Sequence, residues 1–266
     1  MSTNPSSPAI DNSSTTTSTE QKQGTVNLKK LQEDVRIYEY SSAANPDILP
    51  IPVLALPAQV HQSGESRVIP FDLSTQMGLS YPATSPNLLA SFIRILANES
   101  LDTEANATSQ AFYIINGSGQ TTSSSSVVIP WAKGDLFVLP ATTQPVIHSA
   151  TTDAAIYWIT DQPLLSYLGV KPSIPKFQPT LFKQERMLRE VEEISHAPGA
   201  EHLNRMGILL GNKITENTTK TLTHVMWSLV NVLPPGNNQR PHRHNSVALD
   251  LCISSAPIEG ITLASP

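Results

Sequence analysis

The chain has 266 residues, 17 basic and 22 acidic side chains and a formal net charge of -5. This length allows one large domain or two ordinary ones, and the lack of a Lys/Arg cluster argues against a nucleic-acid surface. No secretory pattern and no apolar run near the roughly 18 residues of a membrane span occur, so a cytoplasmic protein with no membrane contact is expected. The single cysteine, Cys252, excludes an internal disulfide and fits a reducing compartment.

The first half of the chain predicts a disordered tail followed by many short strands. Residues 1–25 are almost entirely Ser, Thr, Asn, Pro and Gln, which cannot bury enough apolar surface to become ordered. A short helix is expected at 27–33. Strand-like runs separated by turn residues follow at 67–73, 88–97, 111–116, 126–129, 135–139 and 154–160. Because no helices intervene, residues 26–172 predict a β-sandwich or barrel.

The second half predicts a linker, a helix and further strands. Four prolines at 172–179 mark a linker, and apolar side chains recur at helical spacing over 181–194, so residues 173–198 are assigned to a linker and helix. Strands are expected again at 207–210, 221–233, 246–253 and 260–263.

A pair of histidines precedes one of these strands. His242 and His244 are separated by one residue and lead into a run in which apolar residues alternate from Val247. On a strand the two imidazoles would share one face, and neutral imidazole binds Fe, Zn, Cu and Ni. Asp250 would share that face as a ligand or as a hydrogen-bond acceptor. An exposed His-x-His pair without a metal is the alternative interpretation.

The residues around this pair resemble a known family. Gly236, five residues, then His-x-His is similar to the first metal motif of cupins, and Pro-His-Arg-His-Asn-Ser-Val-Ala-Leu resembles a segment of gentisate 1,2-dioxygenases and their salicylate- and hydroxynaphthoate-cleaving relatives. The resemblance implies an all-β bicupin of two jelly-roll barrels, forming homo-oligomers, in which Fe(II) held by three His cleaves a small aromatic acid. Ala248 stands where many other cupins have Glu, which agrees with a three-His site.

The resemblance leaves both barrels incomplete. Residues 199–266 would be a truncated C-terminal cupin without the second motif and its His, so that the chain is either a fragment of a longer reading frame or a degenerate paralogue. In the N-terminal cupin, the positions that match the first motif's ligands hold Glu104, Asn106 and Gln110, while His148 follows a second-motif pattern that begins at Gly134. Amide oxygens bind Fe(II) weakly, so these four residues are a weak or lost site. A metal-free first barrel is expected, with a remodelled, oxygen-rich site for a harder ion as the alternative.

Two functional hypotheses follow. The first is a gentisate-dioxygenase-like, Fe(II)-dependent ring-cleaving scaffold, whose activity, if any, would belong to the second barrel and need residues beyond Pro266. The second is a non-catalytic cupin that binds a small molecule or pairs with another subunit. The remaining histidines, His61, His196, His202 and His224, occur singly and are interpreted as surface or hydrogen-bonded core residues.

Overall fold

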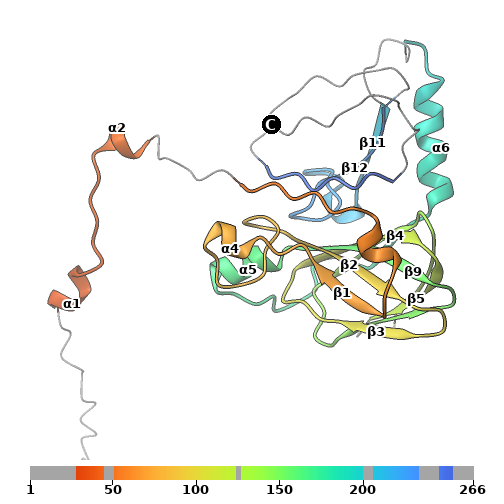
Figure 1. Cartoon of the computed structure of the whole chain (residues 1–266). Coiled ribbons are helices and arrows are strands. Elements are labelled where there is room, and N and C mark those ends of the chain that lie inside the picture. Colours follow the sequence, from red (N-terminus) through yellow and green to blue (C-terminus); the bar gives the residue numbers. More distant parts are fainter. Residues whose placement is uncertain (1–27, 45–50, 124–126, 200–205, 234–245, 254–266) are drawn as a thin grey trace, which may run out of the picture. The chain divides into compact units, whose positions relative to one another are not determined.

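The computed structural model describes residues 28–44, 51–123, 127–199, 206–233 and 246–253 (Figure 1). The chain divides into two compact units, residues 1–48 and 49–266. In the first unit the described elements are the helices α1 (Leu28–Gln32) and α2 (Tyr40–Ala43), and α1 matches the helix expected at 27–33. The tail expected at 1–25 lies outside the described residues. None of the described helices is long and apolar enough to cross a membrane.

The second unit contains two larger antiparallel sheets and a hairpin. The strand order is β1-β2-β9-β4-β7-β10 in the six-stranded sheet and β3-β8-β5-β6 in the four-stranded sheet. The six-stranded sheet consists of β1 (Arg67–Pro70), β2 (Leu89–Ile95), β9 (Ala154–Thr160), β4 (Ser109–Asn116), β7 (Leu136–Pro140) and β10 (Thr180–Phe182). The four-stranded sheet consists of β3 (Ser100–Thr103), β8 (Val146–Ala150), β5 (Ser118–Thr122) and β6 (Val128–Ala132). The hairpin pairs β11 (Met206–Leu210) with β12 (Ser228–Val232).

Short helices connect these strands. They are α3 (Gln59–Gln62), α4 (Ser74–Met77), α5 (Gln162–Leu168), α6 (Gln184–Ser195) and the 3-10 helix η2 (Lys213–Thr215). The helix expected over 181–194 therefore begins later, because residues 180–182 instead pair with β7 as strand β10.

The main core lies between the two larger sheets. Every second residue of a strand points into it, as Phe112 and Ile114 do from β4 and Trp131 does from β6. Phe112 stacks on Phe137 with ring centroids 4.7 Å apart and on Trp158 at 5.9 Å. The molecule is thus mostly β, as the sequence predicts, and the described strands form three separate sheets.

The second jelly roll predicted for residues 199–266 is not confirmed. The described part of this range forms one two-stranded sheet and η2. The strand expected at 221–233 is reduced to β12, and residues 246–253 form no assigned strand. The expected strand at 260–263 lies outside the described residues.

The outer face of the six-stranded sheet is covered in two parts. Toward β7, side chains such as Val138 pack against Met187 of α6, Leu210 of β11 and Met226. Toward β2 and β9 the cover comes from segments far apart in sequence. Phe92 and Tyr157 pack there against Leu56 and Val60 from the N-terminal side and against Leu249 and Leu251 from the C-terminal side.

A buried carboxylate fixes the start of α6 to the sandwich. Asp135 accepts hydrogen bonds from the backbone N–H of Ala132 at 2.9 Å and of Gln184 at 3.0 Å, and it forms an ion pair with Lys183. Gly134 before it has φ of +84°, where a side chain would be strained and would collide with Gln184. The Gly-Asp pair that resembles the second cupin motif therefore has a structural role in this chain.

Candidate binding pocket

The histidine predicted as a third ligand, His148, lies in the sandwich core. Its Nε2 is 2.9 Å from the hydroxyl of Thr103 and its Nδ1 is 2.8 Å from the hydroxyl of Thr121, which also accepts a hydrogen bond from Trp131. Burial lowers the pKa of His148 to about 3, so the ring is neutral near pH 7. In a neutral imidazole one nitrogen donates and the other accepts, so both nitrogens are already used.

The other three candidates of the first β region form no hydrogen bond to His148. Gln110 is fully buried, where its oxygen accepts from the indole N–H of Trp158 at 3.3 Å and its amide donates to Thr142 at 3.4 Å. The Asn106 amide donates to the carbonyl of Val170 at 3.0 Å, and Glu104 is exposed. As placed, these groups do not fit an Fe(II) ion, because binding one would require breaking the hydrogen bonds of Gln110 and His148.

Among the described residues, no three His, Cys, Asp or Glu side chains lie together so that they could hold a metal ion. His242 and His244 lie outside the described residues, so the site expected at this pair stays a prediction.

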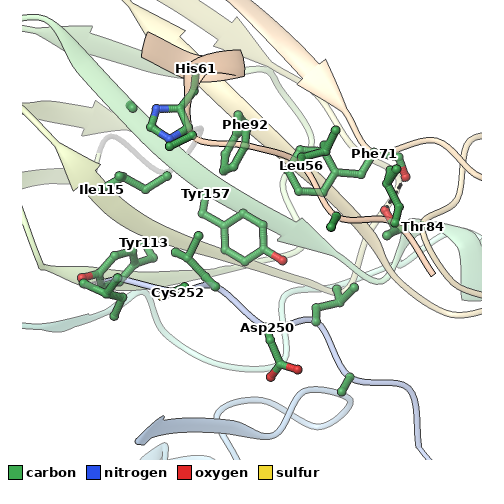
Figure 2. Close-up of a pocket in the computed structure, with 18 of the residues that line it drawn as sticks. Leu56, His61, Phe71, Thr84, Phe92, Tyr113, Ile115, Tyr157, Asp250 and Cys252 are labelled. Atoms are coloured by element: carbon green, nitrogen blue, oxygen red, sulfur yellow. Dashed lines mark hydrogen bonds between the residues drawn. The ribbon is translucent and has the colours of Figure 1, made fainter. Parts of the chain in front are cut away.

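The described residues line a hollow on the outer face of the six-stranded sheet (Figure 2). This outer pocket has a volume of about 1120 Å³. Phe92 of β2, Tyr157 of β9 and Tyr113 of β4 are side by side in the strand register and line it. Residues 51–62 and 247–253 provide further walls.

The segment 247–253 shows the alternation that the sequence predicts, although it pairs in no ladder. Val247, Leu249 and Leu251 are partly buried, while Ala248, Asp250 and Cys252 are exposed. The apolar side chains of Leu249 and Leu251 pack against the sheet cluster that contains Phe92 and Tyr157. Asp250 lines the outer pocket, a position that strand parity alone does not reveal.

His61 brings a buried ring to the wall of the outer pocket. Its side chain comes from α3 and is 6% exposed, and its ring lies edge-on to Phe92 with centroids 4.5 Å apart. Its Nδ1 atom has no hydrogen-bond partner among the described residues. Burial lowers the pKa of His61 and the nearby positive charge of Arg94 adds to this effect, although the ring's own backbone opposes it. The ring is therefore neutral near pH 7, with an unused polar atom.

Tyr157 brings a second polar group to the same pocket. The residue is 6% exposed, and its hydroxyl makes no hydrogen bond to another described residue. Figure 2 shows its ring among the labelled lining side chains, with Phe92 on one side and Asp250 on the other. Burial raises the pKa of Tyr157, and the negative charge of Asp250 raises it further. The hydroxyl is thus protonated near pH 7 and able to donate.

The buried positive charge at the pocket, that of Arg94, is already neutralised. Arg94 donates to the carbonyl oxygens of Gly64 at 2.7 Å and of His61 at 3.2 Å, and it pairs with Asp153 at 3.6 Å. These contacts hold the guanidinium in place and leave little of its charge for a ligand.

The sequence-based interpretation missed this pocket. It treats His61 as a surface or hydrogen-bonded core residue, and the structure places it in the core with one unpartnered nitrogen. One signal was present in the sequence. β2 and β9 are apolar on both faces and buried along nearly their whole length, which indicates a sheet covered on its outer side as well.

Among known proteins, the chain matches solved structures and neither a family model nor a curated protein. No protein-family model matches the chain, and no curated protein matches it. Among solved structures, a cupin superfamily protein from Desulfitobacterium hafniense aligns with 18% identity over 43% of this chain and 92% of that protein, with a TM-score of 0.30.

Other solved structures that align with this chain are those of salicylate 1,2-dioxygenase from Pseudaminobacter salicylatoxidans. Its structure with gentisate adducts aligns with 20% identity over 46% of this chain and 29% of the enzyme, at a TM-score of 0.34. A second structure of that enzyme aligns with 19% identity over 47% and 32%, also at 0.34. The chain therefore spans 29–32% of the enzyme's length in a distant structural similarity.

Proposed function

We propose that this chain is a non-catalytic, cupin-like β-sandwich that binds a small, largely apolar molecule in the outer pocket. The observation that carries this proposal is the buried Nδ1 of His61, which has no hydrogen-bond partner among the described residues and lies at the wall of a hollow that Tyr157 also lines. Buried polar groups in proteins are hydrogen-bonded in roughly 90% of cases or more, so the unused nitrogen of His61 indicates a missing partner. The volume of about 1120 Å³ is ample for a small molecule.

The interior of the sandwich supports the non-catalytic half of this proposal. The side chains that replace the expected ligands there are engaged in hydrogen bonds that stabilise the core, and His148 uses both nitrogens in this way. Any chemistry would have to come from elsewhere in the chain.

Binding of an uncharged apolar fluorophore tests the proposal. N-Phenyl-1-naphthylamine should bind saturably with a dissociation constant in the micromolar range and gain fluorescence. Ala248→Trp, at an exposed position of the pocket lining, should weaken this binding at least about tenfold by filling the hollow. Ala132→Trp is a matched control, because Ala132 is exposed on β6 and does not line the pocket. Equal binding by the two variants, or no saturable binding at all, would refute the proposal.

A second candidate function is Fe(II)-dependent cleavage of a small aromatic acid. The alternation of residues 247–253 favours it, because the chain that leads directly from the His pair is extended with one apolar side, as a strand carrying His242 and His244 would require. In this candidate the two imidazoles bind iron, which supplies Lewis-acid and redox chemistry when present. A third ligand would come from another copy of the chain in a homo-oligomer or from residues beyond Pro266.

Iron content separates the second candidate from the first. If His242 and His244 are ligands, protein purified with Fe(II) should retain iron by mass spectrometry, and it should consume oxygen with gentisate, salicylate or hydroxynaphthoate. His242→Ala should lose the iron, whereas His196→Ala, at an exposed histidine on the C-terminal side of α6, should keep it. Absence of both iron and oxygen uptake in the wild type would remove the dioxygenase candidate and leave the binding proposal intact.

A further inference from the structure

The aromatic side chains of the outer pocket favour a flat ring as the ligand. Phe71 lies edge-on to Phe92 with centroids 4.7 Å apart, and Phe92 and Tyr157 are tilted at 5.9 Å. Ring faces and edges arranged in this way contact another ring well, since aromatic pairs favour offset and edge-to-face geometries. The neutral imidazole of His61 extends the same surface.

The charges at the pocket are unevenly placed. Arg94 and Asp153 form an ion pair, and Lys133 is exposed, so this part of the lining holds charges of both signs. Tyr157 and Asp250, in contrast, line the pocket together, with Asp250 on the side of the Tyr157 ring away from Phe92 (Figure 2), and the negative charge of Asp250 acts on the hydroxyl. Asp250 forms no ion pair with another described residue. A carboxylate group placed against the Tyr157 hydroxyl would therefore approach a like charge.

A hydroxyl group of the ligand suits the position next to Tyr157 and Asp250. Its oxygen can accept a hydrogen bond from the protonated hydroxyl of Tyr157, and its own hydrogen can be donated to the carboxylate of Asp250. An uncharged acceptor such as a ketone would satisfy Tyr157 alone, and an anion would satisfy Tyr157 while being repelled by Asp250. A hydroxyl group of the ligand is thus the group that can form hydrogen bonds to both Tyr157 and Asp250.

From this arrangement we propose that the outer pocket selects an uncharged, hydroxyl-bearing aromatic compound over the corresponding carboxylic acid. The inference rests on the proposed binding function and assigns the ligand class. It also separates the outer pocket from the aromatic-acid substrate expected for the His242 and His244 site.

Matched ligands test the inference by displacement of N-phenyl-1-naphthylamine at pH 7. We expect 2-naphthol, which is uncharged at this pH, to displace the probe at a concentration at least about tenfold lower than 2-naphthoate does. Tyr157→Phe should weaken 2-naphthol about fivefold or more and leave naphthalene unchanged. Asp250→Asn should bring 2-naphthol and 2-naphthoate close to equal affinity, whereas Asp102→Asn, at an exposed position of β3, should keep the wild-type ratio.

The outcomes distinguish this inference from the proposed function. If the probe binds but 2-naphthoate displaces it as well as 2-naphthol does, the pocket exists and the assigned ligand class is wrong. If the ratio is unchanged in Asp250→Asn, the carboxylate does not select the ligand and the inference is again wrong. If the probe itself does not bind to the wild type, the proposed function fails and the inference fails with it.

Discussion

Lowering the pH from 7 to 4 should reduce the free energy of unfolding of the wild-type chain by about 3 kcal/mol more than that of a His148→Gln variant. The pKa of His148 is about 3 in the folded chain and 6.5 in an unfolded one. Between these values the unfolded chain binds a proton that the folded chain does not, so falling pH favours unfolding. The loss begins as the pH falls below 6.5 and levels off below 3.

The His148→Gln variant is the matched control, because glutamine can still donate and accept hydrogen bonds toward Thr103 and Thr121 but does not titrate in this range. Burial is the cause of the lowered pKa of His148, so the expected pH dependence comes from the position of this ring and not from a neighbouring charge. His61 also has a lowered pKa and should contribute in the same direction, so His61→Gln serves as the comparison. Urea unfolding at pH 7, 5.5 and 4 measures the difference. Parallel pH dependences of wild type and His148→Gln would show that the ring is accessible to protons in the folded protein.

The strands that are easiest to predict from the sequence are those that are apolar on both sides. β2 and β9 are central strands of the six-stranded sheet, and their mostly apolar runs are visible without any structure. β5 was missed because its sequence, Ser-Gly-Gln-Thr-Thr, carries no apolar residue, and its inward Thr121 is instead satisfied by His148 and Trp131. Polar residues that bond to each other inside a core give no periodic apolar signal.

The outer pocket could not be predicted because its parts are distant in sequence. The alternation of residues 247–253 indicates which side of the segment is buried, but not that it lies over β9 without forming a ladder with it. The same holds for residues 51–62 on the N-terminal side. A period of two gives the buried face of a segment, and its partner depends on the tertiary arrangement.

The Gly-Asp pair at 134–135 shows how one motif can be interpreted in two ways. As a sequence it resembles the second metal motif of a family. In the structure Gly134 supplies a left-handed turn between β6 and β7, and the carboxylate of Asp135 holds the first residues of α6. The stability of the chain should therefore depend on this pair.

Replacing Asp135 with Ala should lower the free energy of unfolding by about 3 kcal/mol. Asp135 is fully buried, and its removal leaves the N–H groups of Ala132 and Gln184 and the ammonium of Lys183 without their acceptor. Each lost hydrogen bond is expected to cost about 1 kcal/mol, and the ion pair raises the total. Chemical denaturation at pH 7 measures the change.

Lys183→Met provides the control for the charge alone. The Lys183 side chain is half exposed and its ammonium can be solvated, so the loss should stay below about 1 kcal/mol even though the ion pair is removed. A large loss in Asp135→Ala with a small loss in Lys183→Met would assign the stabilisation to the backbone N–H groups that Asp135 accepts from. Hydrogen exchange should then rise first in α6, because Gln184 is the residue whose N–H loses its acceptor. If Asp135→Ala is as stable as the wild type, the carboxylate does not fix α6, and a role of the Gly-Asp pair outside folding would be favoured.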